Sequence, residues 1–252
     1  MVENGRLQKD FSSVYGATVF DPQGRRQKAE KALSIIRDHY PDIRSLDMLD
    51  IGCTAGFGTR TYAEQFHSAI GIDIDEPAVV YAAQHNVRPN LQYMVMNSQQ
   101  TAFADESFDI IICTHVYEHV PDAAGLMSEI YRLLKMGGAC YFTAGNRLSL
   151  MEPHYRLPLL SVLPKWLAHY YLRILKRGEF YYETHLTYWG LKKLVSKFQV
   201  IDYTVEVVRN PVRFHATDVI VPGSFKQKYS LAALWTAYWI CPTYLWLLKK
   251  VK

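Results

Sequence analysis

The alternation of short apolar runs with amphipathic stretches over residues 47–145 most constrains what this chain can fold into. Five of the runs have the length of strands: 47–51, 68–72, 91–96, 108–113 and 139–144. Helical patterns between them are expected at 59–66, 77–85 and 123–134, the last stopped by Gly137 and Gly138, and a further helix at 27–40. Strands that alternate with helices indicate parallel βαβ units. We therefore predict a doubly wound, Rossmann-like α/β sheet of seven mostly parallel strands, with helices on both faces.

The pattern changes after Asn146, although residues 1–252 are expected to form a single domain around a core at 27–146. The segment 149–185 is rich in Pro, Tyr, Leu and His. We predict that it caps the carboxyl ends of the strands, where ligands of open α/β sheets bind. A helix is expected at 186–198. The last two strands are expected at 200–208 and 216–221, followed by an apolar, aromatic, helical segment at 229–252.

Composition narrows the classes of function. A net charge of +4 without long Lys/Arg blocks predicts no nucleic-acid partner. The four cysteines lack CxxC pairing and are expected to be reduced, packed thiols of a cytoplasmic protein. The first eleven residues lack the apolar core of a signal peptide, so no export is predicted.

A glycine-rich turn, MLDIGCTAGFG at 48–58, joins the first strand to a helix. Glycine lets backbone N–H groups and a helix N-terminus approach a ligand closely. Asp73 closes the second strand about 20 residues later, where a carboxylate can accept both hydroxyl hydrogens of a ribose. The alternatives are a tight turn for the glycines and a helix cap for Asp73. We favour a nucleotide-type cofactor site.

The motifs LDIGCTAGFGT, GIDID, ADESFDIIICTHVYEHVPD and EIYRLLKMGGACYFT, in this order and spacing, resemble those of class I S-adenosylmethionine (SAM) dependent methyltransferases. The resemblance spans 47–145 and implies SAM as the cofactor. It implies that Asp50 and the Gly52–Gly56 turn face the methionine end, that Asp73 binds the ribose, and that Asn97 and Ser98 lie beside the adenine. The implied cofactor residues are Asp50, Gly52, Cys53, Gly56, Asp73, Ile74, Asn97, Ser98 and His115.

Two residues depart from the family pattern. Thr54 replaces the usual middle glycine of the turn, and Asn97 replaces an acid. The amide oxygen of Asn97 can still accept a hydrogen bond from the adenine amine. Each change is expected to weaken or reshape SAM binding without removing the ribose anchor at Asp73.

Two other enzyme classes share parts of this pattern. A nicotinamide-dependent oxidoreductase would need a GxGxxG turn, which the sequence lacks. The stretch His115–His119 matches the HxxEH motif of inverted zinc enzymes. That motif needs both histidines on one helix face, but a strand ends just before His115 and Pro121 follows His119 by two residues. We predict no metal site in this stretch and a structural role for His119, with a zinc enzyme as the less favoured alternative.

Methyl transfer from a sulfonium is an in-line displacement, and a general base is needed only for a hydroxyl or a similarly weak acid. The candidate bases are His154, His115 and His185, each of which has a structural role as its alternative. His154 is the first choice, because it follows the fifth strand closely enough to fold over the cofactor.

The stretch EPHYRLPLLSVLPKWLAHYY resembles segments of methyltransferases in bacterial surface polysaccharide and lipid pathways, which implies a glycan or lipid-linked acceptor. Aromatic residues among basic ones over 165–177 are typical of an interfacial helix, although core packing is an equal alternative. The run 231–248 has no charged residue. It is expected to contact a membrane surface, to pack against the domain or a second subunit, or to span a membrane.

These patterns together predict a SAM-dependent methyltransferase for a small-molecule or lipid-linked glycan acceptor, acting on oxygen. We expect a cytoplasmic protein with peripheral contact at the inner face of the membrane. The alternative is a non-catalytic SAM-binding or scaffold protein. The sequence leaves the oligomeric state open.

Overall fold

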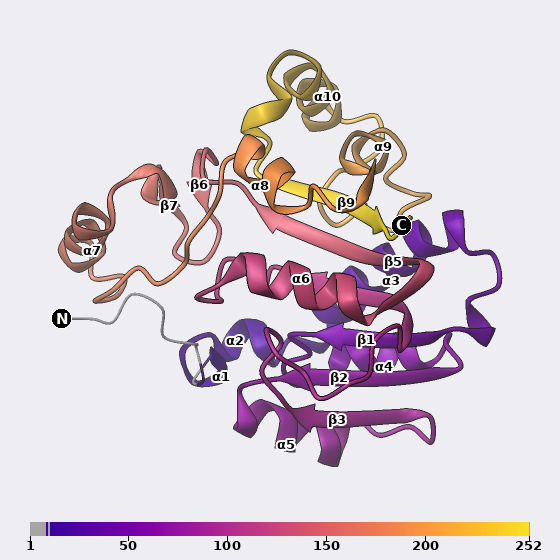
Figure 1. Ribbon diagram of the computed structural model, residues 1–252. Helices are drawn as coiled ribbons and strands as arrows, with labels where there is room; N and C mark the ends of the chain where they lie inside the picture. The colour runs from indigo at the N-terminus through magenta and orange to yellow at the C-terminus, as the bar shows by residue number, and fades with distance from the viewer. Residues whose placement is uncertain (1–8, 10, 252) are drawn as a thin grey trace.

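The computed structural model describes residues 9 and 11–251 and contains a seven-stranded sheet (Figure 1). The expectation of no signal peptide rests mostly on residues 1–8 and 10, which lie outside the described residues. Six strands run in the same direction, and β9 is antiparallel to both of its neighbours, which confirms the mostly parallel sheet of seven strands. In spatial order the strands are β3 (Leu91–Val95), β2 (Ser68–Asp73), β1 (Asp47–Ile51), β4 (Phe108–Thr114), β5 (Leu134–Gly145), β9 (Thr243–Lys249) and β8 (Gln199–Asp202).

Helices cover both faces of the sheet. Alternate residues of the central strands enter two separate cores: Met48 and Ile110 pack with α3 (Pro22–His39) and α4 (Phe57–Ala63) on one face. Leu49 and Ile111 pack with α6 (Ala123–Leu133) and α8 (Tyr188–Leu194) on the other. Strands buried on both faces are near-continuous apolar runs, as these are. The remaining helices of the sheet region are η1 (Ile43–Ser45), α5 (Glu76–His85), α9 (Thr204–Arg209), α10 (Phe225–Ala237) and η3 (Tyr238–Ile240).

The expected stop at Gly137 and Gly138 is wrong, because both glycines lie inside β5. Gly137 has a φ of +80°, a left-handed conformation that glycine adopts without steric cost. The pairing register with β4 shifts between Phe108 and Ile110, directly opposite this point. The glycines therefore lie in an irregular stretch of the pairing between β4 and β5 and do not end an element.

The expected positions of the last two strands are also wrong. The strand predicted at 200–208 is short and gives way to α9, and 216–221 forms turns. The seventh strand is β9, which comes from the apolar run at 231–248 and is inserted between β5 and β8. Trp246, Leu247 and Leu248 are fully buried there. The segment 229–252 is thus half helix and half core strand, because a buried strand carries the same uncharged pattern as an apolar helix.

The segment 146–185 lies beyond the carboxyl end of β5 (Figure 1). It contains a hairpin of β6 (Met151–Glu152) and β7 (Leu157–Pro158), then η2 (Leu160–Val162) and α7 (Lys165–Ile174). A small core of its own includes Leu160, Leu172 and Tyr181. The short helices α1 (Phe11–Val14) and α2 (Gly16–Val19) lie at the same edge of the sheet. In the described part of the chain, no helix is long and apolar enough to cross a bilayer.

Candidate active site

The turn after β1 is shaped by glycines. Gly52 and Gly56 have φ values of +78° and +80°, and the amides of Gly52 and Cys53 donate to the Ile72 carbonyl at 2.9 and 3.1 Å. A Cβ on Gly52 would lie 2.7 Å from Val116 Cγ2. The turn is thereby tied to β2 and held close to the end of β4, where a side chain at position 52 would clash with Val116. We call this glycine turn at the strand ends the cradle.

Thr54 is the strained member of this turn. Its φ of +48° lies in the left-handed region, which β-branched residues rarely adopt. Its backbone amide donates to the Asp73 carboxylate at 2.9 Å. The residue that departs from the family pattern therefore occupies a position that suits glycine, and a hydrogen bond to the predicted ribose anchor holds it there.

Two carboxylates border the cradle. Asp50 is buried and accepts a 2.6 Å hydrogen bond from Thr59 Oγ1. Burial raises the pKa of Asp50 to about 7, against this hydrogen bond and the attraction of Arg25. Asp73 accepts from the amides of Thr54 and Asp75, and burial raises its pKa. Each carboxylate oxygen of Asp73 can accept further hydrogen bonds, as a ribose would require.

Arg25 was not predicted from the sequence. It is half-buried near the start of α3, where burial lowers its pKa while the nearby carboxylates of Asp50 and Asp73 oppose that shift. Its Nε donates to the Thr18 carbonyl at 3.2 Å. The neighbouring Arg26 points to solvent, and nothing in the sequence distinguishes the two arginines.

The other predicted cofactor residues lie at the same edge of the sheet. Ile74 directly follows β2, and Asn97 and Ser98 follow β3. Because β1, β2 and β3 are parallel neighbours, their carboxyl ends meet there. The side-chain oxygen of Asn97 accepts from the Gln99 amide at 3.0 Å. The structure thus brings the predicted cofactor residues together along one edge.

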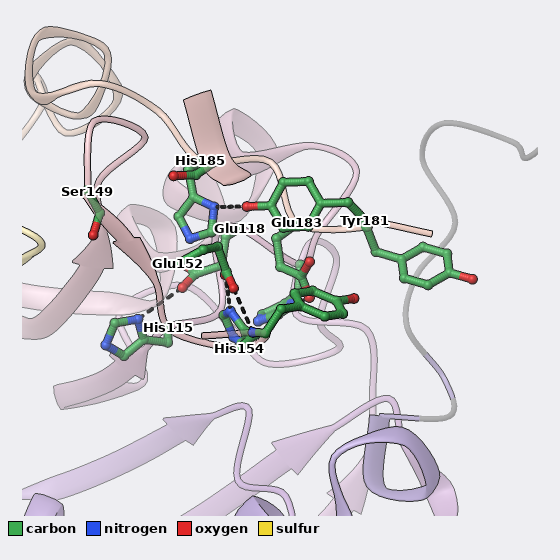
Figure 2. Close-up of polar contacts among 12 residues, drawn as sticks. His115, Glu118, Ser149, Glu152, His154, Tyr181, Glu183 and His185 are labelled. Atoms are coloured by element: carbon green, nitrogen blue, oxygen red, sulfur yellow. Dashed lines mark hydrogen bonds and ion pairs between the residues drawn. The ribbon is translucent and has the colours of Figure 1, made fainter. Parts of the chain in front are cut away.

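The three candidate bases lie in one cluster at the neighbouring strand ends (Figure 2). His115 follows β4, and its Nδ1 lies 2.9 Å from Glu118 Oε1. His154, between β6 and β7, has its Nδ1 2.7 Å from Glu152 Oε1. His185 Nδ1 lies 3.0 Å from the Tyr181 hydroxyl. Each imidazole is therefore oriented through one nitrogen by a fixed partner.

Three buried carboxylates in this cluster were missed by sequence reasoning. Glu118, Glu152 and Glu183 are each at most 1% exposed. Burial opposes ionisation of Glu118, but the hydrogen bond and charge of His115 bring its pKa down to about 2. Burial raises the pKa of Glu183. The repeated Glu-x-His pattern of Glu152 to His154 and Glu183 to His185 is a signal that could have identified two of the three.

Tyr15 connects the N-terminal helices to this cluster. Its hydroxyl donates to Glu183 Oε1 at 2.7 Å across 168 residues of sequence. The HxxEH stretch itself forms a turn: His115 has a φ of +55° and residues 117–119 are not helical. Its two histidines therefore do not share a helix face, as the sequence indicated.

Comparison with known proteins finds a family model that matches part of this chain. Residues 49–142 match the family model described as a methyltransferase domain. The ubiquinone biosynthesis O-methyltransferase of Pseudomonas putida (strain GB-1) is 28% identical over 144 residues, which are 56% of this chain and 58% of that protein. The chain therefore spans a little over half the length of this curated relative.

Solved structures show the same fold over a longer stretch. A chain in the complex of the Haloferax volcanii Trm112 methyltransferase activator with a methyltransferase has a TM-score of 0.60 at 14% identity, covering 98% of this chain and 99% of that one. Haemonchus contortus phosphoethanolamine N-methyltransferase 2, bound to phosphomonomethylethanolamine and S-adenosylhomocysteine, has a TM-score of 0.52 at 20% identity, covering 86% of this chain and 51% of that one.

These findings confirm the family resemblance. Residues 49–142 form a methyltransferase domain that resembles those of class I SAM-dependent methyltransferases, which supports SAM as the cofactor. The residues present fit that cofactor, because the two desolvated carboxylates of Asp50 and Asp73 suit a ligand that carries an amine and ribose hydroxyls.

Proposed function

We propose that this protein transfers the methyl group of SAM to a hydroxyl oxygen of a small or lipid-linked acceptor. The observation that carries the proposal is that a nucleotide-type cradle and a buried His/Glu cluster share one edge of the sheet. An O-methyltransferase among the relatives supports oxygen as the acceptor atom. SAM, when bound, supplies a methyl group on a sulfonium.

Five residues are proposed to bind the cofactor through charge and hydrogen bonds. Asp73 accepts the ribose hydroxyls with its free lone pairs. Asp50 faces the amine of the methionine end of SAM. The Arg25 guanidinium pairs with the carboxylate of that methionine end. Asn97 and Ser98 contact the adenine. Support comes from the shared edge of the strands and from the position of Arg25 beside both aspartates.

His115 is the proposed general base. Its Nδ1 faces buried Glu118, which leaves Nε2 to accept a proton. Its side chain is 37% exposed, against 17% for His154, so it is the more accessible to an acceptor. In the reaction the acceptor oxygen forms a bond to the methyl carbon as the carbon–sulfur bond breaks. The hydroxyl proton passes to His115, and S-adenosylhomocysteine leaves. His154 and His185 line the cap side of the same cluster.

The lipid-linked acceptor and the peripheral contact with the inner face of a membrane rest on exposed aromatic residues. On α7, Trp166 and Tyr170 are exposed together with Arg173, and the exposed Lys176 and Arg177 follow the helix. No residue of α10 is buried, and its Trp235 is 89% exposed. Aromatic side chains with a basic rim are typical of surfaces that lie at a lipid interface. This distribution also supports an acceptor of the polysaccharide or lipid pathways to which the cap sequence is similar.

The first test is calorimetric titration with SAM and S-adenosylhomocysteine. We expect binding in the micromolar range that weakens by about tenfold or more in Asp73→Ala, because charge-assisted hydrogen bonds contribute roughly 1.5–3 kcal/mol each. Asp105→Ala, an exposed carboxylate far from the cradle along the chain, is the control. Wild-type protein that is folded but binds neither ligand would contradict the cofactor assignment.

The second test is methyl transfer to phenolic and lipid-linked glycan acceptors, with and without anionic phospholipid vesicles. Methylated product on an oxygen supports the proposal, and stimulation by vesicles that Trp235→Ser reduces supports membrane contact. Tight SAM binding without turnover on any acceptor would favour the non-catalytic alternative, for which the strained Thr54 is the supporting observation.

A further inference from the structure

Three side chains from separate parts of the chain meet beneath the cap with the donor set of a metal site. His119 lies in the turn after β4, His154 between the cap strands, and Glu183 in the segment that leads back to the core. One ligand atom from each lies within 4.8 Å of the others. The rings of His119 and His154 are 5.0 Å apart and meet edge to face. Figure 2 shows His154 and Glu183 converging at this point.

Two atoms of this cluster have no hydrogen-bond partner among the described residues. They are His119 Nδ1 and Glu183 Oε2, and both are buried. His119 Nδ1 is 3.9 Å from Glu183 Oε1, which is too long for a hydrogen bond. Buried polar atoms of native proteins are almost always satisfied, because an unpartnered one keeps the full cost of its desolvation. An unpartnered imidazole nitrogen and an unpartnered carboxylate oxygen are both atom types that bind metal ions.

The third donor is already oriented. Glu152 Oε1 lies 2.7 Å from His154 Nδ1, and its other oxygen accepts the Tyr155 amide at 2.8 Å. This carboxylate fixes the tautomer in which His154 carries its proton on Nδ1 and presents the lone pair of Nε2. The same carboxylate–histidine pair supports most histidine ligands of metal ions.

We propose that His119, His154 and Glu183 bind one divalent cation, with Zn²⁺ as the best match. Two imidazoles and one carboxylate are a ligand set of catalytic zinc sites, whereas Mg²⁺ and Ca²⁺ prefer oxygen donors. Tetrahedral zinc requires donors roughly 3.3 Å apart, and one ligand atom of each side chain already lies within 4.8 Å of the others. The fourth position remains for a water or for an oxygen of the acceptor. The site is distinct from the HxxEH pairing, because His115 Nδ1 is engaged with Glu118.

A second group of donors overlaps the first but fits less well. Glu152, His154 and His185 also lie within 4.8 Å of one another. However, both oxygens of Glu152 and the Nδ1 of His185 already have partners. Glu152 therefore serves as the support of His154, and the ion belongs with the two unpartnered atoms.

The proposal is tested by metal binding in the full chain, without SAM or acceptor, so its outcome is independent of the proposed function. Protein dialysed against a chelator is titrated with Zn²⁺ in competition with a chromophoric indicator, and Co²⁺ serves as a spectroscopic probe. We expect one equivalent of tightly bound Zn²⁺, and with Co²⁺ a visible absorption typical of four-coordinate geometry. The exposed His67→Gln is the matched control.

Glu183→Gln and His119→Gln should each weaken Zn²⁺ binding more than a hundredfold, whereas Glu152→Gln should weaken it by about 10–100-fold as a support of the ligand. Circular dichroism establishes that each variant is folded. Folded wild-type protein that takes up no Zn²⁺ would overturn the proposal. So would Zn²⁺ uptake that Glu183→Gln leaves intact and His115→Gln abolishes, because the ion would then lie at the HxxEH stretch.

Discussion

Two parts of the carboxyl end of the sheet are built in different ways: the cofactor edge, at the ends of β1, β2 and β3, and the cap edge, at the ends of β4 and β5. At the cofactor edge, Asp73 is held by amides 19 and two residues away, and Asp50 by a hydroxyl nine residues away. At the cap edge, Glu183 accepts from Tyr15 across 168 residues. Local construction lets a cofactor site persist as one motif, and 49–142 is the part that the methyltransferase family model matches. A site assembled from distant segments can change its specificity without disturbing that motif.

Removal of the proposed base tests whether turnover depends on the cap edge while SAM affinity depends on the cofactor edge. His115→Gln should lower turnover by about 10²–10⁴-fold, the usual contribution of a general base, because no group then accepts the acceptor proton. SAM affinity should change little, since the ribose and methionine contacts remain. Single-turnover kinetics and calorimetry measure the two quantities separately. Full turnover in this variant would exclude His115 as the base.

Arg25 tests whether the cofactor edge depends on one residue from outside the motif. Arg25→Ala should weaken SAM binding by roughly 10–100-fold, because a charge-assisted pair with the methionine carboxylate is lost. Arg26→Ala, one position along the same helix but exposed, is the matched control and should bind normally. Equal losses in both variants would mean that general positive charge, and not a specific pair, is responsible.

The pH dependence of SAM binding examines the buried carboxylate at this edge. Asp50 has a pKa of about 7 in the folded chain, so below that pH it is protonated and must lose its proton to pair with a cation. SAM affinity should therefore rise with pH, by up to about tenfold per unit below 7, and level off above it. Calorimetry in buffers of different ionisation enthalpy detects the proton release. Asp50→Asn should remove this dependence, and a flat profile in the wild-type protein would refute the assignment.

The same pKa shift has the opposite sign for stability. The raised pKa means that the folded chain holds this proton at pH values where an unfolded aspartate has released it. The contribution of Asp50 to stability is therefore present at low pH and is lost as pH rises from about 4 toward 7.

The smallest effect is expected at the strained turn. Thr54→Gly should stabilise the protein by about 0.5–1 kcal/mol, because relief of a left-handed β-branched residue outweighs the added chain entropy of glycine. Thermal unfolding with and without SAM measures the change. If the variant is less stable, the threonine side chain makes a compensating contact, and the cofactor edge is less local than we describe.

How much of each site could be predicted from the sequence depends on whether its contacts are local or join distant segments of the chain. The first five strands were placed within a few residues because buried parallel strands and amphipathic helices have distinct periods. The glycine turn and Asp73 were found because their spacing is fixed by one βαβ unit. Arg25, Tyr15 and Glu183 were missed because their partners are far away in the sequence, and no local pattern records such contacts. The last strand was missed because an uncharged aromatic run is equally consistent with a helix.

The placement of β9 beside β5 has a consequence for anyone who isolates the cofactor core. Residues Ala139–Gly145 of β5 pair along their whole length with β9. A fragment that ends at residue 142 or 145 would expose the backbone donors and acceptors of β5 as an open, apolar sheet edge. Such edges recruit strands from other molecules. The segment that the family model matches is therefore expected to aggregate by itself, and its solubility is supplied by a strand about a hundred residues further along the chain.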